Sequence, residues 1–218
     1  MFVAVAALCL FGCSSVPFRE VDLVSLEEVN PREMLERFAL ALPVEFQLVN
    51  TVSFEFRGNA LSAIGYTDID AAKKTLTVVG LHPAAGIKLF ELSGDADQVE
   101  CTFALEDFTR QGDFARAVAD DTRRMYFDRV PAVDAKISEE KYRISFTERT
   151  TDGELEYVFA GSDGLLVEKR YHRKGRRIWS VHYYEYLREN GKLYPAGIIL
   201  KHHEHRYQLV VRLKEIRS

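Results

Sequence analysis

The chain has 218 residues, of which 47% are hydrophobic and 28% charged, and its formal net charge is −4. This composition is typical of one globular domain or at most two small ones. The negative net charge argues against a nucleic-acid-binding protein, so no nucleic-acid partner is expected. Beyond the N-terminus, no apolar run approaches the about 18 residues that a membrane-spanning helix needs.

The N-terminus carries an apolar run, residues 2–11, that fits the core of a secretory signal peptide. The letters LFGC at 10–13 resemble the lipobox of bacterial lipoproteins. That resemblance implies cleavage before Cys13 and attachment of lipid to its thiol, so that the chain is anchored to a membrane. Ser14 after the cysteine implies the outer membrane of a Gram-negative bacterium, with the protein facing the periplasm. The alternative is a buried N-terminal segment whose cysteine is incidental.

We therefore predict a signal peptide at 1–12, a lipidated tether at 13–25 and a single domain at 26–218. Loss of Cys9 and acylation of Cys13 leave Cys101 as a lone cysteine, so no intramolecular disulfide is expected. Alternation in the segment VECTFAL places Cys101 on one face with Phe103. This pattern predicts a small buried hydrophobic residue and not a catalytic thiol.

The segment NPREMLERFALALP at 30–43 predicts the first helix. Asn30 can cap the helix, Pro31 suits its first turn, and Pro43 ends it. Apolar residues recur at helical spacing, which predicts one buried face formed by Met34, Leu35, Phe38 and Leu42.

The remaining chain is dominated by strand-like segments. From 44 to 56 apolar residues alternate with polar ones, which predicts a long strand with one buried face. Further strands are predicted at 60–69, 74–81, 86–93 and 98–105, and a second helix at 112–128. Strands then resume at 141–149, 154–160, 164–172, 176–187, 193–203 and 205–216. Short turns with Asp-Gly or Asn-Gly join several of them, so we predict roughly eleven antiparallel strands.

The order of these elements resembles the LolA/LolB lipoprotein-carrier fold, and the chain is similar to bacterial outer-membrane lipoproteins of poorly characterised function related to LolB. The resemblance is carried by LTVVGLHPAAGIKLFELSGD (76–95), GDFARAVADDTRRMYFD (112–128) and YPAGIILKHHEHRYQLVVRLKEI (194–216). It implies an α+β fold in which a strongly curved antiparallel sheet, an open half-barrel, is covered by helices and encloses an apolar cavity for acyl chains.

A covered half-barrel encloses a space that side chains either fill or leave hollow. Large apolar residues on the strands form the candidate wall of a hydrophobic ligand cavity, with an ordinary packed core as the alternative. These residues are Phe46, Leu48, Phe54, Phe56, Leu76, Val78, Leu89, Phe103, Phe146, Phe159, Trp179 and Tyr183.

The resemblance also implies a membrane-contact loop, because LolB has an apolar protrusion between its third and fourth strands that helps to deliver cargo. The corresponding segment here is 81–86, with Leu81, Pro83 and Ala84 as the candidates for contact. The alternative is a plain turn stiffened by Pro83.

A second candidate for membrane contact is the basic segment EKRYHRKGRR at 168–177. We predict that its charges gather at a hairpin tip formed by Lys169, Arg170, Arg173, Lys174, Arg176 and Arg177. A solvated turn is one interpretation. Contact with anionic lipid head groups is the other, provided that the protein is tethered at a membrane.

The sequence offers few groups for chemistry. His202, His203 and His205 could form a metal site with a histidine of a neighbouring strand, but their spacing matches no known zinc enzyme, and no metal is predicted. There is no G-x-S-x-G motif and no glycine-rich phosphate loop. We therefore predict no catalytic residue, no cofactor and no enzyme activity.

Together these features predict a non-catalytic outer-membrane lipoprotein. It binds an acyl chain or other amphiphile in an apolar cavity, for envelope lipid or lipoprotein handling, and an envelope protein is a further candidate partner. The alternative is a structural or assembly lipoprotein with a packed core that acts through a protein partner.

Overall fold

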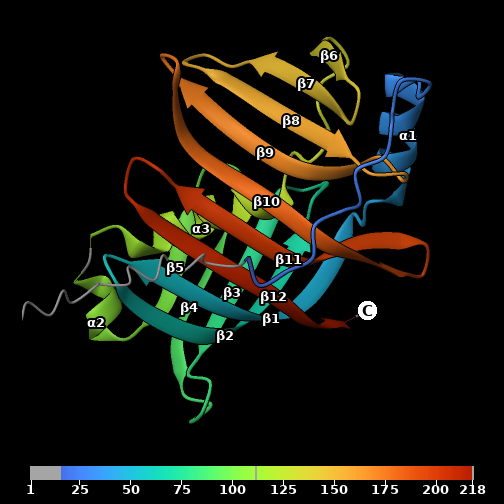
Figure 1. Cartoon of the computed structure of the whole chain (residues 1–218). Helices are drawn as coiled ribbons and strands as arrows, with labels where there is room; N and C mark the ends of the chain where they lie inside the picture. Colours follow the sequence, from blue (N-terminus) through green and yellow to red (C-terminus); the bar gives the residue numbers. More distant parts are fainter. Residues whose placement is uncertain (1–15, 111, 218) are drawn as a thin grey trace, which may run out of the picture.

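The computed structural model of this chain describes residues 16–110 and 112–217. These residues form one strongly curved, open sheet with the strand order β5-β4-β3-β2-β1-β12-β11-β10-β9-β8-β7-β6 (Figure 1). Every neighbouring pair is antiparallel. The predicted antiparallel half-barrel with helices packed on it is confirmed, whereas the predicted signal peptide and Cys13 lie outside the described residues.

The sheet consists of two meanders that meet in its middle. The first comprises β1 (Glu45–Phe56), β2 (Asn59–Asp70), β3 (Thr75–Leu81), β4 (Lys88–Gly94) and β5 (Val99–Ala104). The second comprises β6 (Lys136–Glu140), β7 (Arg143–Arg149), β8 (Glu154–Ala160), β9 (Leu165–Arg173), β10 (Arg176–Glu189), β11 (Lys192–His202) and β12 (Tyr207–Arg217). The first and last strands pair, with Val52 opposite Val211, and this pairing joins the two halves.

The structure has one strand more than the roughly eleven predicted. The additional strand is β6, whose sequence KISEE is mostly exposed and has Ile137 as its single apolar residue. Because one apolar residue gives no alternation, the sequence pattern could not reveal this edge strand. The four-residue helix α2 (Glu106–Thr109) was also not predicted.

Both predicted helices are confirmed, and so is Asn30 as the cap of the first. α1 (Pro31–Ala41) begins after Asn30, whose side-chain oxygen accepts hydrogen bonds from the backbone N–H groups of Arg32 (3.0 Å) and Glu33 (3.4 Å). α3 (Phe114–Tyr126) begins after Asp113, which accepts a hydrogen bond from the backbone N–H of Arg116 (3.3 Å). These side chains satisfy N–H groups that the first helical turn leaves without partners.

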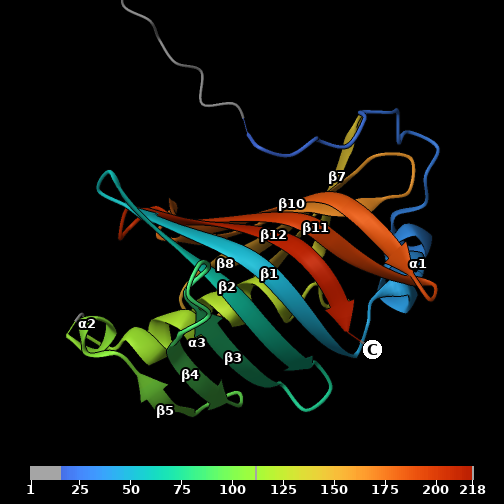
Figure 2. The same ribbon diagram turned by 90° about the horizontal axis from the view of Figure 1, so that it is seen from below.

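The sheet order explains why α3 covers the concave face. β5 and β6 are consecutive strands that lie at opposite edges of the sheet, so the segment between them must cross it. Figure 2 shows that α3 makes this crossing on the inner side of the curve. α1 packs at the other end of the sheet, where the Phe38 ring lies 5.3 Å from that of Phe159 on β8.

The segment that precedes α1 is packed on the convex face. It crosses β10, β11 and β12 on the outside of the sheet (Figure 1). Phe18 is buried there and stacks on Tyr184 at 5.4 Å, while Arg212 donates a hydrogen bond to the Pro17 carbonyl (2.7 Å). Gly197 makes this possible, because a Cβ atom at that position would overlap the Phe18 ring. The described part of the predicted tether is therefore attached to the domain.

None of the helices among the described residues is long and apolar enough to cross a membrane.

Candidate functional site

Most of the predicted cavity residues lie on the concave side of the sheet. The buried ones are Phe46, Leu48, Leu76, Val78, Leu89, Phe146, Phe159 and Tyr183. All of these except Leu89 belong to one continuous cluster, against which Trp179 packs as a partly buried neighbour. The structure thus brings these side chains together between the sheet and its helices, in mutual contact.

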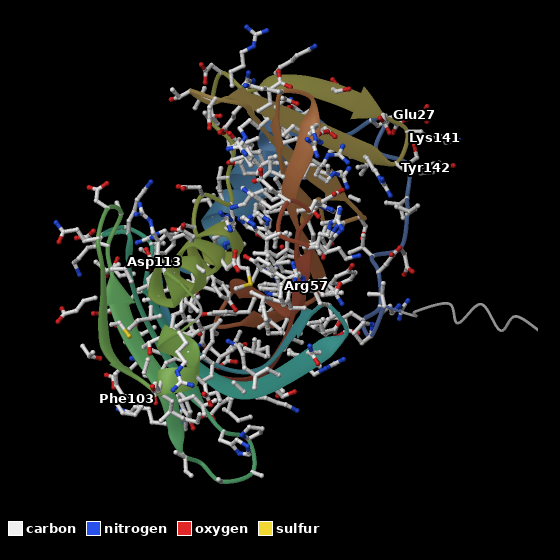
Figure 3. The ribbon with its side chains drawn as sticks, turned by 90° about the vertical axis from the view of Figure 1, so that its left-hand side faces the viewer. Glu27, Arg57, Phe103, Asp113, Lys141 and Tyr142 are labelled. Carbon is white, nitrogen blue, oxygen red and sulfur yellow. The ribbon has the colours of Figure 1, made fainter. Side chains whose placement is uncertain are left out.

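Besides Leu89, three of the predicted cavity residues lie outside this cluster. Phe54 and Phe56 are half-buried, with ring centroids 6.3 Å apart, and Phe54 also lies 5.4 Å from Tyr207. Phe103 does not face the core but is 40% exposed on the edge strand β5, as Figure 3 shows.

The prediction that Cys101 is buried is wrong. Cys101 is an exposed free cysteine, and its Sγ lies 3.5 Å from the carbonyl oxygen of Phe103. β5 is an edge strand whose residues 100–103 are exposed on both faces, so alternation along it does not separate a buried face from an exposed one.

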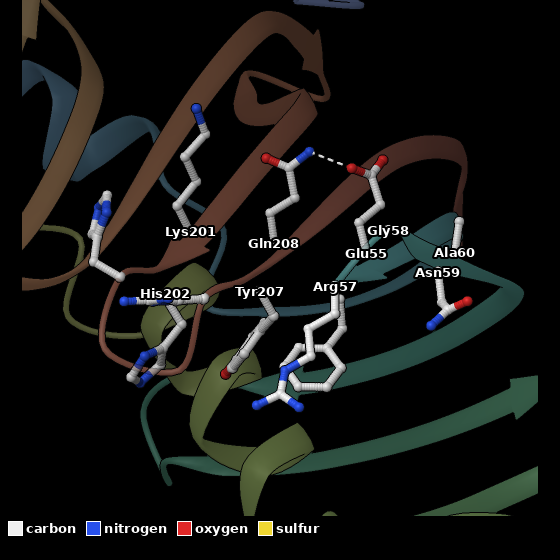
Figure 4. A pocket seen from close by; sticks show the side chains of 12 residues that line it. Glu55, Arg57, Gly58, Asn59, Ala60, Lys201, His202, Tyr207 and Gln208 are labelled. Carbon is white, nitrogen blue, oxygen red and sulfur yellow. Dashed lines mark hydrogen bonds between the residues drawn. The ribbon is translucent and has the colours of Figure 1, made fainter.

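A pocket of about 470 Å³ lies where the β1–β2 and β11–β12 hairpins turn. Arg57, Lys201 and Arg206 give it a basic lining, with Glu55 as its carboxylate. Figure 4 shows His202, Tyr207 and Arg57 on the side of α3, whereas Lys201 and Gln208 point the other way. Gln208 donates a hydrogen bond to Glu55 (2.6 Å) across the two adjacent strands.

The inner wall of this pocket is tied to α3. Tyr207 donates a hydrogen bond to Asp121 (2.7 Å), and Asp121 forms an ion pair with Arg124 (2.6 Å). Burial raises the pKa of Asp121, while Arg124 and Tyr207 oppose that rise. Burial also lowers the pKa of His202 to about 4, so this imidazole is neutral at neutral pH. The pocket therefore shares a wall with the contact that holds α3 on the sheet.

The prediction that Lys169 lies at the hairpin tip is wrong. Lys169 is 2% exposed, inside the half-barrel, and its Nζ donates hydrogen bonds to the carbonyls of Phe127 (2.8 Å) and Asp128 (3.3 Å). A β-bulge explains the error, because the pairing moves from Val158↔Glu168 to Phe159↔Leu166 and skips one residue of β9. The skipped residue places Lys169 on the concave side with Leu166, which simple alternation could not predict.

Its neighbour Arg170 is also absent from the hairpin tip. On the convex face, Arg170 binds both carboxylate oxygens of Glu156, at 2.6 and 2.7 Å. The turn itself has the two-residue geometry expected from Lys174-Gly175, since both residues have positive φ.

Arg129, on the segment between α3 and β6, was missed by the sequence analysis. It is 4% exposed, and its guanidinium lies over the Phe46 ring at 5.8 Å from the centroid. An arginine in a short irregular segment is ordinarily exposed, so no sequence signal marked it as part of the interior.

The predicted membrane-contact loop lies at the tip of the β3–β4 hairpin. Leu81 is half-buried, whereas Pro83 and Ala84 are exposed, and Ile87 is 59% exposed. The turn is stabilised by His82, whose carbonyl accepts from the backbone N–H of Gly86 (2.9 Å). Figure 1 shows this hairpin projecting beyond the rest of the sheet.

The three candidate histidines do not meet at one point, although the rings of His202 and His205 lie 4.4 Å apart. His202 is buried on the side of α3, whereas His203 is exposed, with its Nε2 3.2 Å from the Ser180 hydroxyl. Within residues 16–110 and 112–217, no group of three or more histidine, cysteine or acidic side chains is arranged to hold a metal ion.

Comparison with known proteins shows similarity in structure. No protein-family model matches the sequence, and no curated protein sequence matches it. A LolA superfamily protein from Nitrosomonas europaea matches with a TM-score of 0.54 and 14% identity, over 87% of this chain and 93% of that one. A putative outer membrane lipoprotein-sorting protein domain from Vibrio parahaemolyticus matches with a TM-score of 0.54 and 5% identity, over 85% of this chain and 90% of that one.

Proposed function

Since this chain has a LolA-like fold, we propose that it binds the acyl chain of a lipid, lipoprotein or other amphiphile between its sheet and α3, without covalent chemistry. The observation that carries the proposal is the apolar concave face, which a single crossing helix covers over β3, β4, β5 and β11. An acyl chain can replace apolar contacts of α3 with apolar contacts of its own, so its burial is favourable.

The proposed place of action is the bacterial envelope. The lipobox-like letters at 10–13 support a lipid anchor on Cys13 in the outer membrane, with the domain facing the periplasm. The exposed tip of the β3–β4 hairpin, with Pro83, Ala84 and Ile87, supports a membrane contact during transfer. An envelope protein that delivers or receives the amphiphile is the further partner in this proposal.

The test is native mass spectrometry of the full-length Cys13→Ser chain, which cannot be acylated at that position. We expect co-purifying lipid, or else uptake of a fluorescent fatty-acid probe that long-chain lipids displace. A protein that carries no lipid and takes up no probe would contradict the proposal.

The close packing of the interior favours a second candidate function. Because most of the predicted cavity residues already contact one another, a half-barrel that is permanently filled could act as a structural or assembly lipoprotein through a protein partner. For this second function we expect a protein that carries no lipid and that cross-links reproducibly to one envelope protein in cells.

A further inference from the structure

The interior of the half-barrel contains an arginine with no ionic partner. Arg129 is 96% buried, and none of the hydrogen bonds or ion pairs among the described residues involves its guanidinium. An arginine stays charged at every physiological pH, and a buried charge is costly unless it is paired and hydrogen-bonded.

The nearest groups do not supply the missing anion. The Phe46 ring offers only a cation–π contact at 5.8 Å. Burial raises the pKa of Tyr126 and Tyr186, and in both cases the Arg129 charge opposes that rise, so these hydroxyls are near but neutral. Asp121, the buried carboxylate of α3, is already paired with Arg124 at 2.6 Å.

A second cation lies close to the same segment. Lys169 donates its hydrogen bonds to the carbonyls of Phe127 and Asp128, which directly precede Arg129 in the chain. The Asp128 carboxylate faces outward, with its side chain 63% exposed, and pairs with Lys74 at 3.2 Å. Asp128 and the half-buried Glu148 of β7 are the carboxylates whose charges act on Lys169. Among the described residues, no ion pair joins either of them to Arg129.

Arg129 is not completely enclosed, since the residue keeps 4% of its surface exposed. Among the described residues, Oε1 of Glu168 is fully enclosed and has no hydrogen-bond partner. Glu168 does not compensate Arg129, because its neighbours Arg177 and His182, each 3.7 Å away, are on the convex face.

We propose that Arg129 binds the oxyanion head group, a carboxylate or a phosphate, of the amphiphile that enters the half-barrel. This inference rests on the proposed function and specifies the class of ligand. A guanidinium presents a fork of N–H donors that fits either oxyanion with two parallel hydrogen bonds, and these bonds are strong where water is excluded. The acyl chain then extends along the apolar concave face, so one ligand satisfies both the charge and the apolar surface.

The experiment compares three probes with the same sixteen-carbon chain: hexadecanoic acid, hexadecyl phosphate and hexadecanol. Affinities are measured by displacement of a fluorescent probe from the full-length Cys13→Ser chain at neutral pH. We expect at least one of the acids to bind about tenfold or more tightly than the alcohol, because a charge-assisted hydrogen bond is lost with the alcohol. The stronger of the two acids identifies the head group as carboxylate or phosphate.

Variants then assign the preference to the side chain. Arg129→Met should remove the preference for the acids and leave the affinity for the alcohol within about threefold. Arg129→Lys should retain part of it, and Arg143→Met, at an exposed arginine, should retain all of it. If Arg129→Met does not fold, the wild-type comparison and Arg129→Lys decide the question.

The failures are distinguishable. Equal affinity of the wild-type chain for all three probes overturns this inference and leaves the proposed function intact. A preference for the acids that survives Arg129→Met also overturns it. Binding of none of the probes overturns the proposed function, and this inference with it.

Discussion

Lys169 places an ammonium group where water is largely excluded. Burial lowers its pKa from 10.5 to about 7, and the neighbouring Arg129 acts in the same direction, while Asp128 opposes the change. In the unfolded chain the pKa returns to the ordinary value for lysine, so between about pH 7 and pH 10 the unfolded state binds more protons than the folded one.

The free energy of unfolding should therefore rise with pH across this window, by at most about 1.4 kcal/mol per pH unit from Lys169. Below pH 7 the lysine is charged in both states, and its desolvation penalty is present in full. Urea denaturation between pH 7 and pH 9 measures the rise. Lys169→Met should abolish it, and Lys136→Met, at an exposed lysine, should preserve it. An unchanged slope in Lys169→Met would refute the assignment.

At the scale of single elements, α3 is held on the sheet by a few polar contacts. Tyr207 binds Asp121 (2.7 Å), and the Tyr183 hydroxyl donates to the carbonyl of Met125 (3.0 Å). If α3 must move to admit an amphiphile, these contacts set the free energy of opening.

Tyr207→Phe should therefore accelerate uptake of a fluorescent fatty-acid probe and lower the stability of the chain by about 1–3 kcal/mol, because Asp121 loses a buried partner. Stopped-flow fluorescence measures the rate, and Tyr142→Phe, at an exposed tyrosine, is the matched control. If the probe enters Tyr207→Phe no faster than the wild type, α3 does not limit access.

One of the contacts that hold the segment on the convex face is the close approach of Phe18 to Gly197. Gly197→Ala should force the Phe18 ring away and lower the free energy of unfolding by about 1–3 kcal/mol. In a Phe18→Ala background the same substitution should cost little, because the space is then free.

Thermal denaturation of the two single variants and the double variant measures this coupling. Limited proteolysis within residues 16–25 should report the released segment in Gly197→Ala. Additive effects of the two substitutions would show that the contact does not fix the segment.

The elements that could be predicted are those with local signals in the sequence. α1 and α3 were predictable because capping residues and an apolar stripe are local signals, and hairpins such as Lys174-Gly175 are marked by their turn residues. β6 and the inward position of Lys169 could not be predicted. An edge strand needs no apolar face, and a β-bulge changes which side chains share a face.

At the scale of the whole molecule, the candidate site was predicted in its apolar part only. Phe46, Phe146 and Tyr183 followed from alternation along their strands. The interior charges of Lys169 and Arg129 depend on the bulge in β9 and on how the segment after α3 crosses the sheet. Neither feature is expressed in the spacing of residues along the chain.

The proposed anchor also concerns the molecule as a whole. Because Phe18 is fixed on the convex face, lipid on Cys13 would attach to the domain through a short connection of four residues, 14–17. Cys13→Ser should leave the far-ultraviolet circular dichroism of the domain unchanged and move the protein from the membrane fraction to the periplasmic fraction. Retention of this variant in the membrane fraction would refute acylation as the anchor.

The pairing of β1 with β12 has a consequence for how the chain acquires its structure. Ten of the strand pairings join neighbours in the sequence, but the central one joins distant segments, in which even Glu55 and Gln208 are 153 positions apart. Closing so long a loop is entropically costly and slows folding. Each half can begin to form while the chain is being synthesised, yet the two halves cannot join until β12 has emerged. Until then β1 presents an unpaired apolar strand edge, so this interval is when the nascent chain most needs protection from aggregation.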